Sequence, residues 1–299
     1  LKLYKGGIPA KFGGRVSSVL DVRQKDGNSK NFALTGGIGA ISSRLAAEGP
    51  MFNDRGSFLV AGRGSYAHLF LKLAGEQNSV SFYDLNLKTN YNLSENDKLF
   101  LSGYFGRDIF EFGGSFSSSY GNASGNLRWN HIFNDRLFSN LSLIYSKYDY
   151  ELSIDDFSFD WISSIKNYNA KYDLKYYFSD AFKLDFGVST LKYEFDPGQI
   201  KPKGPDSAIN ELQLEQKRAL ESAAYVNAEH KLTDRLTAQY GVRFSYFNRM
   251  GGQKLSLYAN DQPLVYNNTL HIYQRTDPTD EVSFGKGESI KTFSNVEPR

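Results

Sequence analysis

Glycine-rich segments beside charged residues can form phosphate-binding loops, and the start of the chain holds such a segment. Residues 4–28 have the sequence YKGGIPAKFGGRVSSVLDVRQKDGN. A phosphate-binding loop places Lys and Ser or Thr directly after its glycines and continues into a helix. Here Gly14 is followed by Arg15, and the next residues, Val16–Arg23, have the pattern of a short strand. The segment therefore does not predict a phosphate site.

Side chains that catalyse reactions or bind metals are few and scattered. The chain has no cysteine, which excludes a disulfide framework, a thiolate metal site and a cysteine nucleophile. The four histidines are far apart: His68, His131, His230 and His271. Asp155, Asp156 and Asp160 could bind Ca²⁺, but the spacing and glycine of an EF-hand are missing, and a solvated loop is the alternative. No Ser/His/Asp group recurs at a strand end, so the sequence predicts no enzyme, no metal site and no cofactor.

Alternation with a period of two residues determines where the charged side chains lie. In NYNAKYDLKYYF, Tyr168 and Tyr172 fall on one face of a strand, whereas Lys171 and Asp173 fall on the other. Similar segments recur from about residue 80 onward. Their polar positions are candidates for lining a wet interior: Lys88, Asn126, Arg128, Lys171, Asp173, Lys175, Lys183, Asp185 and Arg243. The pattern indicates long strands with one apolar and one polar face.

The composition agrees with such strands. Aromatic residues make up 15% of the chain, with 20 Tyr and 23 Phe, yet the mean hydropathy is −0.47. Many aromatics at low hydropathy are typical of membrane β-barrels, whose strands alternate between lipid and a polar interior. The net charge of +2 is too balanced for nucleic-acid binding. Aromatics near turns, such as Tyr91, Phe133, Tyr177 and Phe178, are expected to form an interfacial girdle.

Short polar turns separate pairs of strands throughout the chain. They lie at residues 52–56, 94–98, 133–137, 178–182 and 232–236. Longer segments at 110–121, 196–216 and 251–288 are expected to be loops at the opposite end. The predicted fold is all-β, an antiparallel transmembrane β-barrel with eleven strands of about 10–15 residues and a twelfth that starts near Lys291. A β-propeller or β-sandwich would have shorter strands. An open edge cannot remain unpaired in lipid, so either these strands close on themselves or further strands follow, and we expect the second.

The first 75 residues resemble one family, the TonB-dependent outer-membrane receptors. The resemblance lies in the pattern GG-x-PA-x-[aromatic]-GGR-x-SSVLD. The motif residues are Gly6, Gly7, Pro9, Gly13, Gly14 and Arg15. In this family the pattern ends the plug domain, and residues 41–50, Arg63 and Tyr66 look like the family's first strands. The resemblance implies that residues 1–28 are the end of a plug and its link to the barrel. Residues 29–299 would then be the first half of a barrel of probably 22 strands.

The resemblance also implies a function. Such a receptor lies in the outer membrane of a Gram-negative bacterium and imports a scarce or bulky nutrient, which could be a ferric siderophore, a cofactor, an oligosaccharide or a peptide. The TonB complex at the periplasmic face supplies the energy that remodels the plug. Expected partners are this complex, outer-membrane lipid and lipopolysaccharide, the unknown imported ligand and, as a further candidate, a surface lipoprotein. A passive porin or an adhesive barrel is the alternative, and it would lack a plug.

Two outer segments are candidates for ligand contact. In the span 251–288, aromatic and basic side chains could stack on a sugar ring or a catechol, with packing of the loop on itself as the alternative. These side chains are Tyr258, Tyr266, His271, Tyr273 and Arg275. The segment GQIKPKGP at 198–205 could contact lipopolysaccharide or an anionic ligand, or it could be a loop that stands away from the surface. The sequence does not predict which nutrient is carried.

Overall fold

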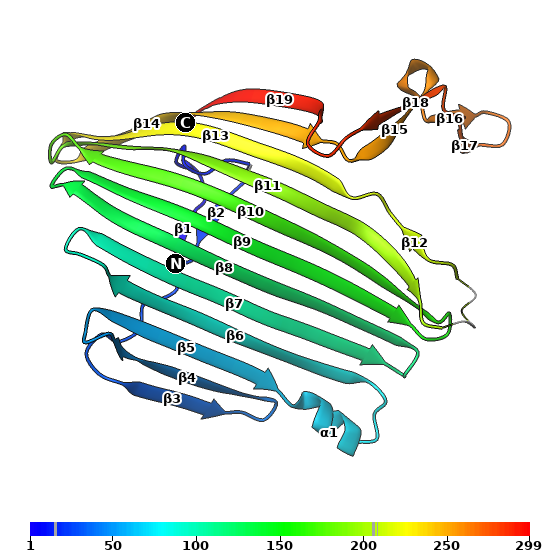
Figure 1. Cartoon of the computed structure of the whole chain (residues 1–299), viewed down its shortest axis with the longest axis horizontal. Helices are drawn as coiled ribbons and strands as arrows, with labels where there is room; N and C mark the ends of the chain where they lie inside the picture. The colour runs from blue at the N-terminus through cyan, green and yellow to red at the C-terminus, as the bar shows by residue number, and fades with distance from the viewer. Residues whose placement is uncertain (15–16, 205–206, 208) are drawn as a thin grey trace.

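The computed structural model describes residues 1–14, 17–204, 207 and 209–299 and consists mainly of long β-strands (Figure 1). The main sheet contains β3 (Ala33–Ile38), β4 (Ser42–Met51), β5 (Gly56–Ser65), β6 (Ser79–Asn92), β7 (Asp97–Phe112), β8 (Phe116–Asn134), β9 (Leu137–Ile154), β10 (Phe159–Tyr177), β11 (Phe182–Pro202), β13 (Lys217–Thr233), β14 (Leu236–Met250) and β19 (Ser289–Pro298). A short strand, β12 (Leu212–Gln213), adds to β11. The described helices are α1 (Ala67–Leu73) and the 3₁₀ turn η1 (Ala259–Asp261), and neither is a long enough apolar segment to cross a membrane.

Neighbours in the sheet follow the order of the chain and are antiparallel. The sheet runs from β3 at one edge to β19 at the other, and these two edges are not paired with each other in the described part of the chain. The predicted all-β antiparallel fold is confirmed. The twelfth strand expected near Lys291 is β19, which begins at Ser289.

The cross-strand register separates polar from apolar side chains. Arg128 lies opposite Ser142, which lies opposite Lys171, which in turn lies opposite Ser189. Because side chains alternate along a strand, the register also fixes the other predicted positions. The same face, here called the polar face, carries Lys88, Asn126, Asp173, Lys175, Lys183, Asp185 and Arg243. All nine predicted interior residues therefore share one face.

The opposite face, here called the apolar face, leaves large apolar side chains exposed. They include Leu101, Leu127, Leu143, Tyr145, Tyr168, Val188 and Phe244. The buried apolar residues are few, with Ile8, Ala10, Leu59 and Tyr225 among them. This sheet therefore does not bury its apolar face against a second protein layer among the described residues.

Aromatic rings gather at the tight turns. The Phe178 ring lies 4.4 Å from that of Tyr176, and the Phe138 ring lies 5.7 Å from that of Tyr177. At the first turn, Phe52 packs edge-on against Tyr91 at 5.0 Å. These contacts place the predicted girdle residues at one end of the strands.

The loops expected at the other end are partly replaced by strand. The span 110–121 was expected to be a long loop, but only residues 113–115 form the turn between β7 and β8. Gly113 and Gly114 have φ values of 55° and 75°, which glycine adopts without a steric penalty and which permit a tight reversal. Residues on both sides therefore continue the ladder, and β7 to β11 reach 16 to 21 residues, longer than predicted.

The expected loop 251–288 is also structured. It contains two hairpins, formed by β15 (Gln253–Leu257) with β18 (Asp280–Phe284) and by β16 (Leu264–Asn267) with β17 (Ile272–Arg275). In Figure 1 they extend as an arm beyond the main sheet, next to the start of β19.

Candidate functional site

The N-terminal segment, residues 1–28, lies along the polar face of the sheet over its described residues, 1–14 and 17–28 (Figure 1). Its two short strands, β1 (Lys2–Tyr4) and β2 (Val19–Asp21), pair with each other and not with the main sheet. Of the expected strand Val16–Arg23, Val16 lies outside the described residues, and Val19–Asp21 form strand among the rest. Between β1 and β2, Ile8, Pro9 and Ala10 are buried.

Arg243 of β14 is the main contact between the sheet and this segment. Its Nη1 donates a hydrogen bond to the backbone oxygen of Ala10 at 3.4 Å, and its Nε donates to Ser245 Oγ at 3.0 Å. Its Nη2 lies 3.9 Å from Glu221 Oε1. Arg243 is 4% exposed, so its guanidinium has lost most of its hydration, and these polar groups replace the hydrogen bonds to water.

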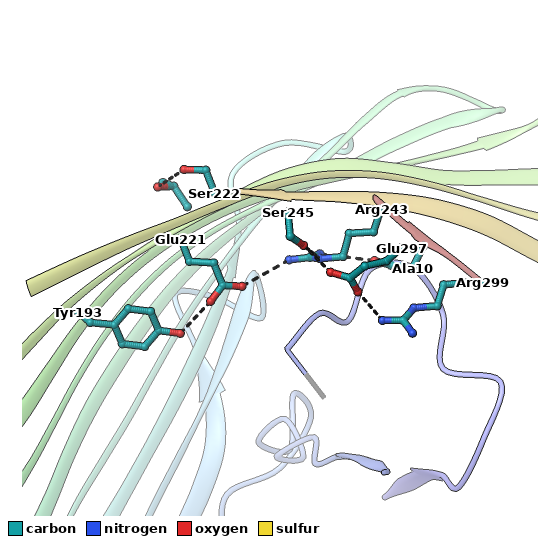
Figure 2. A network of polar contacts seen from close by, with 9 residues as sticks. Ala10, Tyr193, Glu221, Ser222, Arg243, Ser245, Glu297 and Arg299 are labelled. Carbon is teal, nitrogen blue, oxygen red and sulfur yellow. Dashed lines mark hydrogen bonds and ion pairs between the residues drawn. The ribbon is translucent and has the colours of Figure 1, made fainter. Parts of the chain in front are cut away.

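Residues from four strands hold the arginine in place (Figure 2). Glu221 of β13 accepts a hydrogen bond from Tyr193 of β11 at 3.1 Å. Ser245 Oγ donates to Glu297 Oε1 of β19 at 2.7 Å, and Glu297 also pairs with Arg299 at 2.6 Å. The network therefore joins β11, β13, β14 and β19 beneath the segment.

Two glycines let the segment approach the sheet. A Cβ atom on Gly13 would lie 2.2 Å from Arg243 Nε. A Cβ atom on Gly27 would lie 1.9 Å from the backbone oxygen of Phe58 in β5. Gly7 and Gly14 instead have positive φ values of 58° and 65°. Four glycines thus have a geometric requirement, and of these Gly27 was not singled out by the motif.

Gly6 and Arg15 complete the predicted motif. A Cβ on Gly6 would meet open space, so the structure gives this glycine no steric role. Arg15 lies outside the described residues. Pro9 is buried next to Ala10.

A second contact on the same polar face joins the end of the segment to strands near the other edge of the sheet. Lys88 of β6 pairs with Asp26 at 2.7 Å and donates a hydrogen bond to the backbone oxygen of Gln24. Glu48 of β4 pairs with Lys25 at 2.9 Å. The sequence singled out Lys88 but not its partners, because alternation identifies a face without identifying what lies on it.

Four of the remaining polar-face candidates form pairs with one another. Lys171 pairs with Asp173 at 3.3 Å and lies 5.9 Å from the Phe12 ring centre. Lys175 pairs with Asp185 at 3.3 Å. These two pairs lie on neighbouring positions of β10 and β11.

Two further candidates have local partners on the same face, and a third has a buried oxygen without one. Lys183 pairs with Glu229 at 2.7 Å. The guanidinium of Arg128 lies 4.2 Å from the Phe100 ring centre. The buried Asn126 Oδ1 has no hydrogen-bond partner among the described residues.

Only part of the predicted ligand cluster comes together in the arm. The rings of Tyr266 and Tyr273 are 5.1 Å apart, and Tyr266 Oη lies 3.3 Å from His271 Nδ1. Tyr258 precedes η1, and Arg275 lies opposite Leu264 at the other end of the β16–β17 hairpin. The observed contacts are those of a loop packing on itself, the alternative considered from the sequence.

The three aspartates near residue 155 do not form a cation site. Lys203 pairs with both Asp155 and Asp160, the second at 3.4 Å. The hydrogen bond to Asp155 raises the pKa of Lys203 above its ordinary value. Within the described residues, no group of three His, Cys, Asp or Glu side chains could hold a metal ion.

Neither a protein-family model nor a curated protein matches the chain. Solved structures do match. The copper transporter OprC has a TM-score of 0.66 at 11% identity, covering 99% of this chain and 46% of its own. The ferric-catecholate import receptor Fiu of E. coli K12, in its open form, has a TM-score of 0.63 at 12% identity, covering 99% and 55%.

The ferric preacinetobactin receptor BauA of Acinetobacter baumannii matches over a smaller part, with a TM-score of 0.54 at 11% identity, covering 70% of this chain and 39% of its own. The chain therefore spans about half the length of these solved receptors, or less. The structures it resembles are TonB-dependent receptors, and the likeness shows that the chain shares their fold.

Proposed function

We propose that this chain is part of a TonB-dependent outer-membrane receptor that imports a scarce or bulky nutrient by energised remodelling of a plug. In this proposal, residues 1–28 are the end of the plug and residues 29–299 are the first half of the barrel. The carrying observation is that the glycine-rich segment packs on the polar face through Arg243 and Lys88. A passive porin or adhesive barrel would lack a plug segment, so this contact favours the receptor.

The chemistry of the contact suits a part that must move. The segment meets the sheet through backbone oxygens and charged side chains, with Ala10 and Gln24 as the acceptors. Water can replace such contacts when they separate. Separating an apolar interface of the same size would instead expose apolar surface to water on both sides, which costs free energy. A pulling force can therefore detach the segment while the strand ladder stays intact.

The proposed environment follows from the apolar face. Its exposed leucines and aromatics need an apolar solvent, which the outer membrane supplies, and the aromatic contacts at the tight turns fit an interfacial girdle. The proposed partners are the TonB complex at the periplasmic face, outer-membrane lipid and an imported ligand. A ferric siderophore, a cofactor, an oligosaccharide or a peptide remains the proposed range of ligands.

Ala10 provides a direct test, because it is fully buried beneath Arg243 and the chain contains no cysteine. An Ala10→Cys variant of the complete reading frame is expressed in cells with and without TonB, and a membrane-impermeant maleimide is added. We expect labelling only when TonB and a transported nutrient are both present. A Lys30→Cys variant at an exposed position is the control and should label in every case.

Labelling of Ala10→Cys that is the same with and without TonB would contradict energised remodelling. The passive or adhesive barrel would then be the better account. Growth on a panel of iron complexes, cofactors, oligosaccharides and peptides as limiting nutrients identifies the ligand in the same strains.

A further inference from the structure

The apolar face carries a row of charged side chains toward the strand ends that lie away from the tight turns. Lys147 of β9 lies directly opposite Lys166 of β10. Lys166 in turn lies opposite Glu194 of β11, which lies opposite Arg218 of β13. Like charges directly opposite each other on neighbouring strands destabilise a sheet. An anion placed between Lys147 and Lys166 would remove this repulsion.

The carboxylates near the row neutralise only part of its charge. Asp149 Oδ1 lies 3.3 Å from Lys147 Nζ, but the other oxygen of Asp149 binds an arginine of β7. Glu194 is held by Lys192 at 2.7 Å. Within the described part of the chain, Lys166 forms no hydrogen bond and no ion pair within 4 Å. Glu194, which lies opposite it, interacts electrostatically with Lys166 but also with Lys192 and Arg218. Three cations therefore share one carboxylate, and the row keeps a net positive charge that a ligand can neutralise.

An apolar groove lies next to the row on the same face. Its volume is about 590 Å³ and it is open to the outside. The side chains that line it include Leu101, Leu127, Leu143, Tyr145, Tyr168 and Leu220. Lys192 also borders the groove, with its Nζ 5.6 Å from the centre of the Tyr168 ring. A cationic rim beside an open apolar groove matches a ligand with an anionic head and a hydrocarbon tail.

The row also lies at the right depth for a headgroup. Along β10, Lys166 is ten residues from Tyr176, which belongs to the aromatic cluster at the tight turn. Ten residues of strand span about 33 Å. With the usual tilt of about 40°, this is about 25 Å along the membrane normal, the height of the apolar band of an outer-membrane barrel. Lys166 therefore falls where lipid hydrocarbon gives way to headgroups.

We infer that Lys147, Lys166 and Lys192 bind the phosphorylated headgroup of a lipid in the outer leaflet, whose acyl chains lie in the adjacent groove. The inference rests on the proposed function, because it requires the apolar face to contact a membrane. It places lipid recognition on the wall of the sheet. The segment 198–205, where the sequence suggested contact with lipopolysaccharide, is not needed for it.

The test measures binding of one defined lipid to the purified protein made from the complete reading frame. The probe is diphosphorylated lipid A in detergent, with fully dephosphorylated lipid A as the matched ligand. The test variant is Lys147→Gln/Lys166→Gln/Lys192→Gln. The control variant, Lys201→Gln/Lys254→Gln/Lys286→Gln, removes the same charge from positions outside the row.

We expect the test variant to bind diphosphorylated lipid A at least about tenfold more weakly than the wild type, since each cation near an anionic lipid surface contributes a substantial share of affinity. The control variant should bind like the wild type, and the wild type should bind dephosphorylated lipid A as weakly as the test variant does. Equal affinity of the wild type and the test variant would overturn the inference. Full competition by inorganic phosphate at the same concentration would also overturn it, by showing an anion site without lipid specificity.

Two further assays separate this inference from the proposed function: insertion into liposomes, and labelling of Ala10→Cys in cells. Suppose that the protein inserts with heat-modifiable migration and that labelling depends on TonB, yet lipid A binding does not change when the three lysines are replaced. This result would refute the lipid site alone. Protein that never inserts would refute both.

Discussion

At the scale of single residues, the alternating pattern predicted which side chains share a face but not which ones meet. Alternation determines a face because successive strand side chains point in opposite directions. The contact between Arg243 and Ala10 joins residues 233 positions apart and depends on the path of the whole N-terminal segment. Gly27 shows the same limit, because its need for close approach to β5 arises from a neighbour that the local sequence does not reveal.

Gly27→Ala is expected to loosen the segment. The added Cβ would lie 1.9 Å from the backbone oxygen of Phe58, which cannot rotate away. Overpacking of this kind costs about 1–3 kcal/mol. Limited proteolysis of the folded protein should cut the variant faster near Lys25, whereas the control Gly6→Ala, whose Cβ meets open space, should be cut at the wild-type rate. Equal rates for the two variants would mean that the segment does not pack on β5 as described.

Arg243→Ala is expected to weaken the segment's attachment and destabilise the network. It leaves Glu221 without its cation and the Ala10 carbonyl without its donor. Since Glu221 is partly exposed, we expect a loss of about 1–3 kcal/mol rather than the larger cost of a fully buried charge. The measurement is maleimide labelling of Ala10→Cys in cells without TonB, which should rise in the variant. Arg249→Ala, further along the same strand, is the control, and a matching rise there would assign the effect to β14 as a whole.

At the scale of elements, strand order and orientation followed from the sequence, while strand length did not. The tight turns predicted near residues 94–98 and 178–182 separate β6 from β7 and β10 from β11. The prediction of a long loop at 110–121 was wrong. A Gly-Gly pair with polar neighbours resembles a loop, although only residues 113–115 turn the chain. Local composition does not show whether a serine-rich stretch is exposed as a loop or paired in a ladder.

The pair of Lys88 and Asp26 is expected to help fix the segment to β6. Lys88→Asp should weaken this attachment by about 1 kcal/mol, because Asp26 is half exposed and solvent screens the pair. The exchange Lys88→Asp/Asp26→Lys should recover part of the loss. Proteolysis at residues 23–30 in the four members of this double-mutant cycle measures the coupling. A coupling of zero would show that the ion pair contributes nothing and that the hydrogen bond from Lys88 to Gln24 carries the contact.

At the scale of the whole molecule, the sheet has two edges with unpaired backbone groups, β3 and β19. In lipid, each unpaired N–H or C=O costs several kcal/mol, so a stable spanning sheet must close. The solved structures that share this fold are about twice as long as the chain, which fits the proposal that further strands pair with both edges.

Residues 29–299 alone are therefore not expected to form a stable barrel in liposomes. Their edges would pair between copies, giving aggregates that lack heat-modifiable migration on gels, whereas the complete reading frame should insert and migrate as a folded barrel. Mixing the fragment with a second fragment that encodes the remaining strands should restore the folded form, because the missing partners of β3 and β19 are then present. A fragment that inserts alone and conducts ions as a monomer would show that β3 and β19 can pair with each other. The proposed half-barrel would then be wrong.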